Sequence, residues 1–98
     1  MLIARVVGTV VSTQKAEALV GQKFLLLRQM TPEGNETGNF VVATDAVGAG
    51  VNEVVLYASG SSARQTELTK DKPCDAVVMA IVDAIELDRK LTYNKAEA

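Results

Sequence analysis

Short apolar runs separated by polar turn residues follow one another along the whole chain. The runs are rich in Val, Leu, Ile and Ala, and the breaks between them contain Gly, Asn, Thr and Pro. Aliphatic and β-branched runs bounded by such residues are typical of strands. The pattern predicts strands over residues 2–12, 23–30, 39–47, 53–59, 76–87 and 90–93. We therefore expect a mainly β protein.

Two local features refine this expectation. Gly8 lies in the middle of the first run, where a glycine indicates the bend or bulge that small barrels need for closure. The segment 76–87 is ambiguous, because Val78 and Ile85 fit a helical stripe while its apolar residues also fit an alternating pattern. Its β-branched content favours a strand. We expect Asp88 and Arg89 to form a turn before the last short strand.

The apolar runs are hydrophobic on both of their faces. In the run 53–59, Val54 and Leu56 share one face while Val55 and Tyr57 occupy the other, and residues 77–82 are apolar throughout. A barrel of this length can bury only one of those faces inside itself. With no second domain to cover the other face, the pattern predicts that another copy of the chain does so. It predicts a homo-oligomer without giving the number of subunits.

Length and composition agree with one domain over residues 1–98 that lies in the cytosol. The chain is 48% hydrophobic, yet no apolar run approaches the roughly 18 residues that cross a bilayer. Its first residues lack the features of a secretory signal, and the single Cys74 cannot build a disulfide framework. We expect no membrane partner.

Candidate chemistry is sparse. The chain has no histidine, which excludes a Ser-His-Asp triad, imidazole ligands for zinc and a histidine acid–base pair. Its 12 Asp and Glu residues are scattered, and the closest pair with apolar flanks is Asp75 and Asp83. A net charge of −2 and 4% aromatic residues argue against nucleic-acid binding. We predict no catalytic residues, no metal site and no cofactor.

The cluster Gly48-Ala49-Gly50 is tested first as a nucleotide site. A dinucleotide fingerprint would place its third glycine at position 53, which is Glu53, and would open a helix where the pattern predicts a strand. The P-loop signature is absent as well. A turn that requires a positive φ or a close backbone approach explains this cluster better.

The second cluster, Gly60-Ser61-Ser62-Ala63-Arg64, does not match the G-x-S-x-G nucleophile elbow. One alternative is the N-cap of a short helix running towards Leu68, with Arg64 paired to Asp45 or Glu67. The other is a loop whose small side chains let several copies crowd around a symmetry axis. We prefer the second interpretation because of the resemblance described next.

Five segments in register resemble one known family over nearly the whole chain. They are ARVVGTVVSTQK (residues 4–15), GQKFLLL (21–27), ATDAVGAG (43–50), GSSARQ (60–65), and DA (75–76) leading into AIVD (80–83). Together they resemble the EutN/CcmL family, the pentameric vertex proteins of bacterial microcompartment shells. One departure is Asn52, where the family commonly has glycine. Asparagine tolerates the left-handed region, so we expect the turn to persist.

The resemblance implies a small five-stranded OB-like β-barrel with one short helix and a C-terminal β-hairpin. It implies a homopentamer with a narrow central opening that caps the five-fold vertices of a cytoplasmic shell, beside hexameric and trimeric shell proteins. The expected role is structural, not enzymatic. The alternative is a pentameric pore or binding module for small metabolites at the vertex. An OB-type nucleic-acid module is disfavoured by charge and aromatic content.

Two groups of residues are the candidates for assembly. The small-residue loops are expected near the five-fold axis or at subunit contacts: Gly48, Ala49, Gly50, Gly60, Ser61, Ser62, Ala63 and Arg64. The apolar residues Val55, Tyr57 and Val78 are expected to fill contacts within or between subunits.

Overall fold

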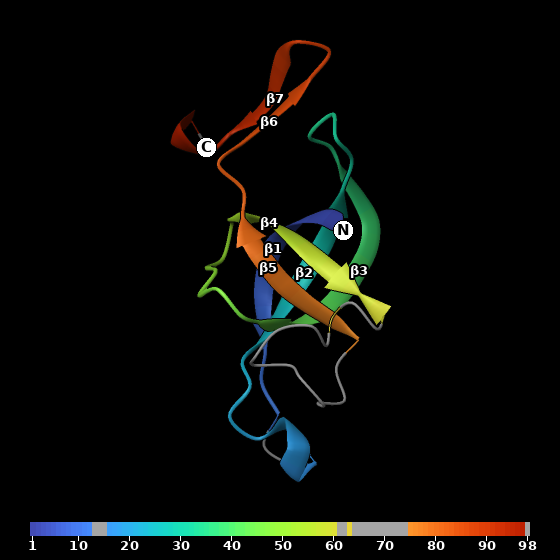
Figure 1. The fold of residues 1–98 in the computed structure, drawn as a ribbon, viewed down its shortest axis with the longest axis vertical. Helices are drawn as coiled ribbons and strands as arrows, with labels where there is room; N and C mark the ends of the chain where they lie inside the picture. Colours follow the sequence, from blue (N-terminus) through green and yellow to red (C-terminus); the bar gives the residue numbers. More distant parts are fainter. Residues whose placement is uncertain (13–15, 61–62, 64–74, 98) are drawn as a thin grey trace.

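Five strands close into a barrel, and a separate two-stranded hairpin follows it in the chain (Figure 1). The computed structural model describes all residues except 13–15, 61–62, 64–74 and 98. The barrel consists of β1 (Leu2–Val10), β2 (Phe24–Met30), β3 (Glu36–Asp45), β4 (Val54–Ser59) and β5 (Ala76–Ile81). The hairpin consists of β6 (Ala84–Leu87) and β7 (Lys90–Asn94), and η1 (Glu17–Leu19) and η3 (Lys95–Glu97) are 3-10 turns. The predicted mainly β architecture is confirmed. The short helix expected from Ser61 or Ser62 lies outside the described residues.

The order of strands around the barrel is β1, β2, β3, β5 and β4, which returns to β1. Neighbouring strands are antiparallel except β3 and β5, which pair in parallel where Thr44 lies beside Val77 and Asp45 beside Val78. This short parallel pairing closes the barrel. Because β2 has β1 and β3 as its neighbours, it lies opposite the seam between β4 and β5.

The bulge expected at Gly8 is confirmed. Along β1 the register passes from the pair Val6 and Leu27 directly to the pair Gly8 and Leu26, so one extra residue of β1 is accommodated between them. Such a bulge bends the strand and increases its twist, which lets a small sheet close on itself.

The segment expected to form one strand over residues 76–87 is two strands, and that expectation is wrong. β5 ends at Ile81 and β6 begins at Ala84. Between them the N–H of Val82 donates to the carbonyl of Val54 at 2.8 Å, so the chain leaves the barrel at this point. The expected turn at Asp88 and Arg89 is confirmed, with φ values of 53° and 67° that match the two-residue type I′ hairpin.

The inward side chains of the five strands form one core. Tyr57 is the largest of the fully buried side chains, and its hydroxyl accepts a hydrogen bond of 2.7 Å from the Gln29 Nε2. Each fully buried aliphatic or aromatic side chain stabilises the fold by about 1.5–3 kcal/mol. The core contains Ala4, Val6, Leu25, Leu27, Ala43, Ala49, Val55, Tyr57, Ala76 and Val78.

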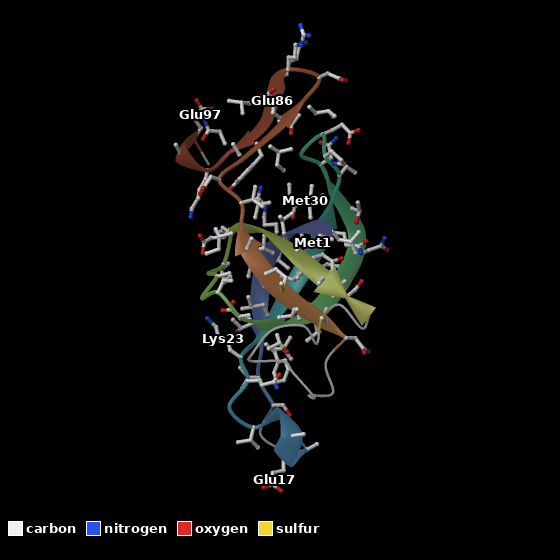
Figure 2. All side chains as sticks on the ribbon, viewed as in Figure 1. Met1, Glu17, Lys23, Met30, Glu86 and Glu97 are labelled. Carbon is white, nitrogen blue, oxygen red and sulfur yellow. The ribbon has the colours of Figure 1, made fainter. Side chains whose placement is uncertain are left out.

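The outer faces of β4 and β5 are covered in part by the chain itself, although the sequence pattern assigned this cover to a second copy. Val54 packs with Met30 and with Tyr93 of the hairpin, and Figure 2 shows Met30 between the barrel and the hairpin. Ala58 and Val77 pack with Ala63. Because the segment 76–87 divides into two strands, its second half leaves the barrel, and Val82 and Ile85 pack over the outward Val54.

The hairpin is held against the barrel by a close backbone contact as well as by this packing. The Thr92 Oγ1 donates to the carbonyl of Pro32 at 2.6 Å, and Gly34 lies against Thr92 with a φ of 91°. The molecule is elongated, 45 Å long and 24 by 23 Å across, with the hairpin at one end of the barrel and η1 at the other (Figure 1).

This contact predicts that Gly34→Ala destabilises the protein strongly. A Cβ at position 34 would lie 2.6 Å from the carbonyl oxygen of Thr92, in addition to the cost of a left-handed φ. We expect the free energy of unfolding to fall by about 3 kcal/mol or more.

The matched control is Gly21→Ala, where φ is 86° but no atom lies within 4 Å of the added Cβ. It should cost only about 1–2 kcal/mol, the price of the backbone conformation alone. Urea denaturation at one protein concentration measures the free energy of unfolding of both variants. Equal losses would contradict a role for the contact with Thr92.

Candidate functional site and assembly surfaces

The described residues contain no cluster of side chains suited to hold a metal ion. Among them, no three His, Cys, Asp or Glu side chains lie close enough together to hold a metal ion. In the same part of the chain, no helix has the length and apolar character needed to cross a membrane. Asp75 and Asp83, the closest carboxylates with apolar flanks in the sequence, lie beyond opposite ends of β5, with six strand residues between them. The two loops with clustered small residues therefore become the candidates.

The loop after β3 is organised by one carboxylate. The Asp45 Oδ1 accepts hydrogen bonds from the N–H groups of Val47, Gly48 and Ala49, at 3.1, 3.0 and 3.3 Å. Its Oδ2 lies 3.7 Å from the Lys23 Nζ, while the side chain itself is almost fully buried. Gly48 has a φ of 77°, so the expected need for a positive φ in this cluster is confirmed.

The middle residue of the cluster faces inward. Ala49 is 1% exposed and belongs to the barrel core, while Gly48 and Gly50 are exposed on either side of it. A larger side chain at position 49 would not fit among the inward residues, because protein interiors are densely packed. Ala49 therefore anchors the loop to the end of the barrel, and only the two glycines present surface to a partner.

The turn that follows joins this loop to β1. Asn52 has a φ of 76°, which confirms that the turn persists with asparagine at this position. Its N–H donates to the carbonyl of Val6 at 2.7 Å, and its own carbonyl accepts from the Arg5 Nη1 at 2.8 Å. These hydrogen bonds hold the residues that precede β4 against β1.

Glu53 connects the same turn to the C-terminal hairpin. Its Oε2 accepts a 2.7 Å hydrogen bond from the Lys95 Nζ, and its Oε1 accepts one of 2.6 Å from the N–H of Gly50. The Lys95 bond first, and the Gly50 bond second, lower the pKa of Glu53, while the bond to Glu53 raises the pKa of Lys95. The Glu53–Lys95 ion pair stabilises the folded state only while both groups are charged. This contribution is lost as pH falls through the lowered pKa of Glu53, and also as pH rises through the raised pKa of Lys95. It is present across the range between them.

The second cluster begins at an exposed turn. Gly60 has a φ of 63°, and its N–H donates to the carbonyl of Asp75 at 2.8 Å. Ala63 is fully buried against Ala58 and Val77. Ser61, Ser62, Arg64 and Glu67 lie outside the described residues. Asp45, one of the partners expected for Arg64, forms its described ion pair with Lys23.

The three apolar candidates lie inside a single protomer. Val55, Tyr57 and Val78 are 0%, 1% and 0% exposed and belong to the barrel core. They were expected to fill contacts within or between subunits, and the structure places all three inside one subunit. They have no free surface to offer a neighbouring copy.

The structure reveals instead an apolar surface that the sequence reasoning did not single out. Phe40 and Val42 point outward from β3 and are 50% and 51% exposed, because Val41 and Ala43 take the inward positions. Phe24 and Leu26 point outward from the adjacent β2 and are half-buried. We call these four residues the β2–β3 face. The alternation of inward and outward positions along residues 39–47 was the signal that could have found it.

Comparison with known proteins gives consistent results across the chain. A family model described as ethanolamine utilisation protein EutN/carboxysome matches residues 1–83. The carboxysome shell vertex protein CcmL of Gloeobacter violaceus is 45% identical over 97 residues, which cover 99% of this chain and 97% of that protein. The solved structure of Gloeobacter violaceus CcmL covers 98% of this chain and 99% of that chain, with a TM-score of 0.94 and 46% identity. GrpN, a pentameric microcompartment shell protein from Rhodospirillum rubrum, has a TM-score of 0.82 at 42% identity, covering 89% of this chain and 99% of that chain.

The loop geometry predicts that Asp45→Ala is more damaging than Asp45→Asn. Alanine leaves three loop N–H groups without their acceptor, whereas asparagine retains one oxygen that can accept from them. We expect Asp45→Ala to lower the free energy of unfolding by about 2–3 kcal/mol, and Asp45→Asn by about 1 kcal/mol.

Glu36→Ala on the same strand serves as the control, because Glu36 makes partly exposed ion pairs with Arg5 and Arg28. It should change stability by less than about 1 kcal/mol. Chemical denaturation measures the free energy of unfolding of all three variants. Equal effects of Asp45→Ala and Glu36→Ala would show that the carboxylate does not organise the loop.

Proposed function

The chain belongs to the EutN/CcmL family of bacterial microcompartment shell vertex proteins, and from this premise we propose that five copies form a ring that caps the five-fold vertices of a microcompartment shell. The family is one of structural shell proteins, so the role of the chain is structural and not enzymatic. The observation that carries the proposal is similarity along almost the full length of both chains to proteins named as shell vertex proteins.

Geometry explains why a shell requires such a protein. A layer of hexagonal tiles is flat, and closing it into a polyhedron requires positions of five-fold symmetry. A vertex protein supplies them by shape, through surfaces that fit its own copies and the adjacent shell proteins. We propose hexameric and trimeric shell proteins as those neighbours, and one vertex-protein domain over residues 1–98.

A closed barrel suits this task physically. Each of the five barrel strands has a paired neighbour on both sides, although β3 and β5 pair only at Thr44 and Asp45, so the barrel leaves less open strand edge than an open sheet would. Side-chain surfaces can be shaped for one partner, whereas an open strand edge would invite indiscriminate pairing.

We propose that the exposed glycines of the two loops lie near the five-fold axis or at subunit contacts. Gly48, Gly50 and Gly60 carry no side chain and are exposed, so other backbone segments can approach them closely. Ala49 and Ala63 support the same proposal indirectly, because both are buried against the barrel beside these segments. Ser61, Ser62 and Arg64 are proposed to contribute through the second loop.

Arg64→Ala is predicted to weaken the ring if Arg64 holds a carboxylate at a subunit contact. Loss of a charged hydrogen-bonding group from an interface typically costs about 2 kcal/mol or more. The solution mass should therefore fall as the variant is diluted, under conditions in which the wild-type ring persists. A pentamer as resistant to dilution as the wild type would argue against this role.

The proposed function predicts what happens to shells that lack this chain. Co-expression of hexameric shell components with the chain should give closed particles, because both hexagonal and pentagonal units are then present. Without the chain, electron microscopy should show open sheets, tubes or particles that lack their corners. Closed particles of equal number and shape in both cases would contradict the vertex role.

A further inference from the structure

A cavity lies where the C-terminal hairpin meets the barrel. Its volume is about 390 Å³, which is within the range of small-molecule sites in proteins. Three parts of the chain line it, namely β1, the turn before β4, and the end of the hairpin with η3. The lining residues are Arg5, Val51, Asn52, Glu53, Tyr93 and Lys95.

Arg5 is held in this cavity by contacts with two of the other lining residues. Its Nη1 donates to the carbonyl of Asn52 at 2.8 Å, and its guanidinium lies 5.8 Å from the centre of the Tyr93 ring. The Arg5 side chain is 23% exposed, so part of it still reaches solvent. A guanidinium that is already positioned loses little conformational freedom when a ligand binds, which favours recognition.

The charge of Arg5 is only loosely paired within the chain. Its ion pair with Glu36 joins the Arg5 Nε to the Glu36 Oε2 at 3.9 Å, which is longer than a hydrogen bond. The same carboxylate also pairs with Arg28, whose Nη1 lies 3.8 Å from its Oε1. Strand pairing places Arg5 and Arg28 directly beside each other, and like charges in that position repel. An additional anion beside Arg5 would therefore be stabilising.

Lys95 supplies a second cation to the same cavity. Its Nζ donates to the Glu53 Oε2 at 2.7 Å, and its backbone N–H donates to the carbonyl of Asp83 at 2.9 Å. An ammonium group has three N–H donors, and the bond to Glu53 uses one of them. The lining therefore carries two cations against the single carboxylate of Glu53, whose Oε1 accepts from the N–H of Gly50. The cavity is locally positive, although the net charge of the chain is −2.

An aliphatic and an aromatic side chain complete the lining. Val51 is 53% exposed, while Tyr93 is largely buried because it packs with Val54 and Met30. A few charged groups placed among apolar walls are typical of sites that bind small molecules. A ligand with one anionic group and one apolar part could therefore contact both kinds of lining residue at once.

We propose that this cavity binds a small organic carboxylate. Arg5 and Lys95 contact the carboxylate oxygens, and Val51 and Tyr93 contact the apolar part of the ligand. The planar fork of an arginine suits a carboxylate, whose two oxygens can accept two parallel N–H bonds. Because β1, the turn before β4 and the hairpin all line the cavity, a bound ligand also joins these three parts of the chain.

Benzoate is the probe for this site, and benzamide is its uncharged control of nearly the same shape. Saturation-transfer NMR of the full chain measures both dissociation constants, with the ionic strength held constant by NaCl. Benzoate should bind with a dissociation constant of about 1 mM, as expected for a ligand of this size. Benzamide should bind at least about ten times more weakly, because it lacks the charge that the two cations recognise.

Three variants with the same new residue locate the site. Arg5→Met and Lys95→Met each remove one cation of the cavity and keep an apolar stem. Lys90→Met is the matched control, because it removes the same charge from an exposed position of β7 that does not line the cavity. The benzoate dissociation constant should rise by about tenfold in Arg5→Met, by about threefold in Lys95→Met and by less than about twofold in Lys90→Met. If circular dichroism shows that Arg5→Met does not fold, Lys95→Met carries the test.

The outcomes separate this inference from the proposed function. Equal binding of benzoate and benzamide overturns the inference, and so does an unchanged benzoate dissociation constant in the folded cavity variants. An equal loss in Lys90→Met overturns it as well, because the attraction would then depend on overall charge and not on this cavity. Native mass spectrometry of the same wild-type sample gives the number of copies independently. A ring of five that does not bind benzoate contradicts the inference alone, whereas a single chain that binds it contradicts the vertex role alone.

Discussion

Burial of one face of every strand inside a narrow closed barrel is the constraint on which the rest of the structure depends. Alternate residues of β1 to β5 fill the interior, and Tyr57 and Leu27 are among those buried almost completely. Because side chains alternate along a strand, the same register that places these residues inside decides which residues point outward. A shift of one residue would exchange the two sets. The surfaces available for assembly are therefore a consequence of how the core is filled.

The chain covers part of its outer surface with its own segments, and this leaves a smaller and more specific surface for partners. The hairpin packs on Val54 through Tyr93, and Ala63 packs on Ala58 and Val77. Ala49 and Ala63 are buried against the barrel, and Gly48 and Gly60 adopt left-handed turns with φ values of 77° and 63°. Among the described residues, the β2–β3 face is an apolar surface that stays accessible. A vertex protein acts through such fixed surfaces, since its function is to hold neighbours at a defined geometry.

Much of the barrel could be predicted from the sequence, because local features determine it. The bulge at Gly8, the left-handed turn at Asn52 and the tight turn at Asp88 each depend on the conformational preference of one or two residues. The break after Ile81 could not be predicted, because the apolar pattern continues through it and the change depends on where the hairpin docks. The two-sided apolar pattern also does not tell which face of a strand points inward, so Val55 and Val78 were candidates for contacts within or between subunits, and the structure places them in the core of one chain. The subunit number came from family resemblance, since alternation alone indicates association and not a ring of five.

Sedimentation equilibrium of the unmodified 98-residue chain tests the central claim most directly, because it measures the mass of the assembly without altering any surface. The account predicts one species of about five times the 10.4 kDa chain mass over the micromolar concentration range. A single species with the mass of one folded chain over that range would contradict it.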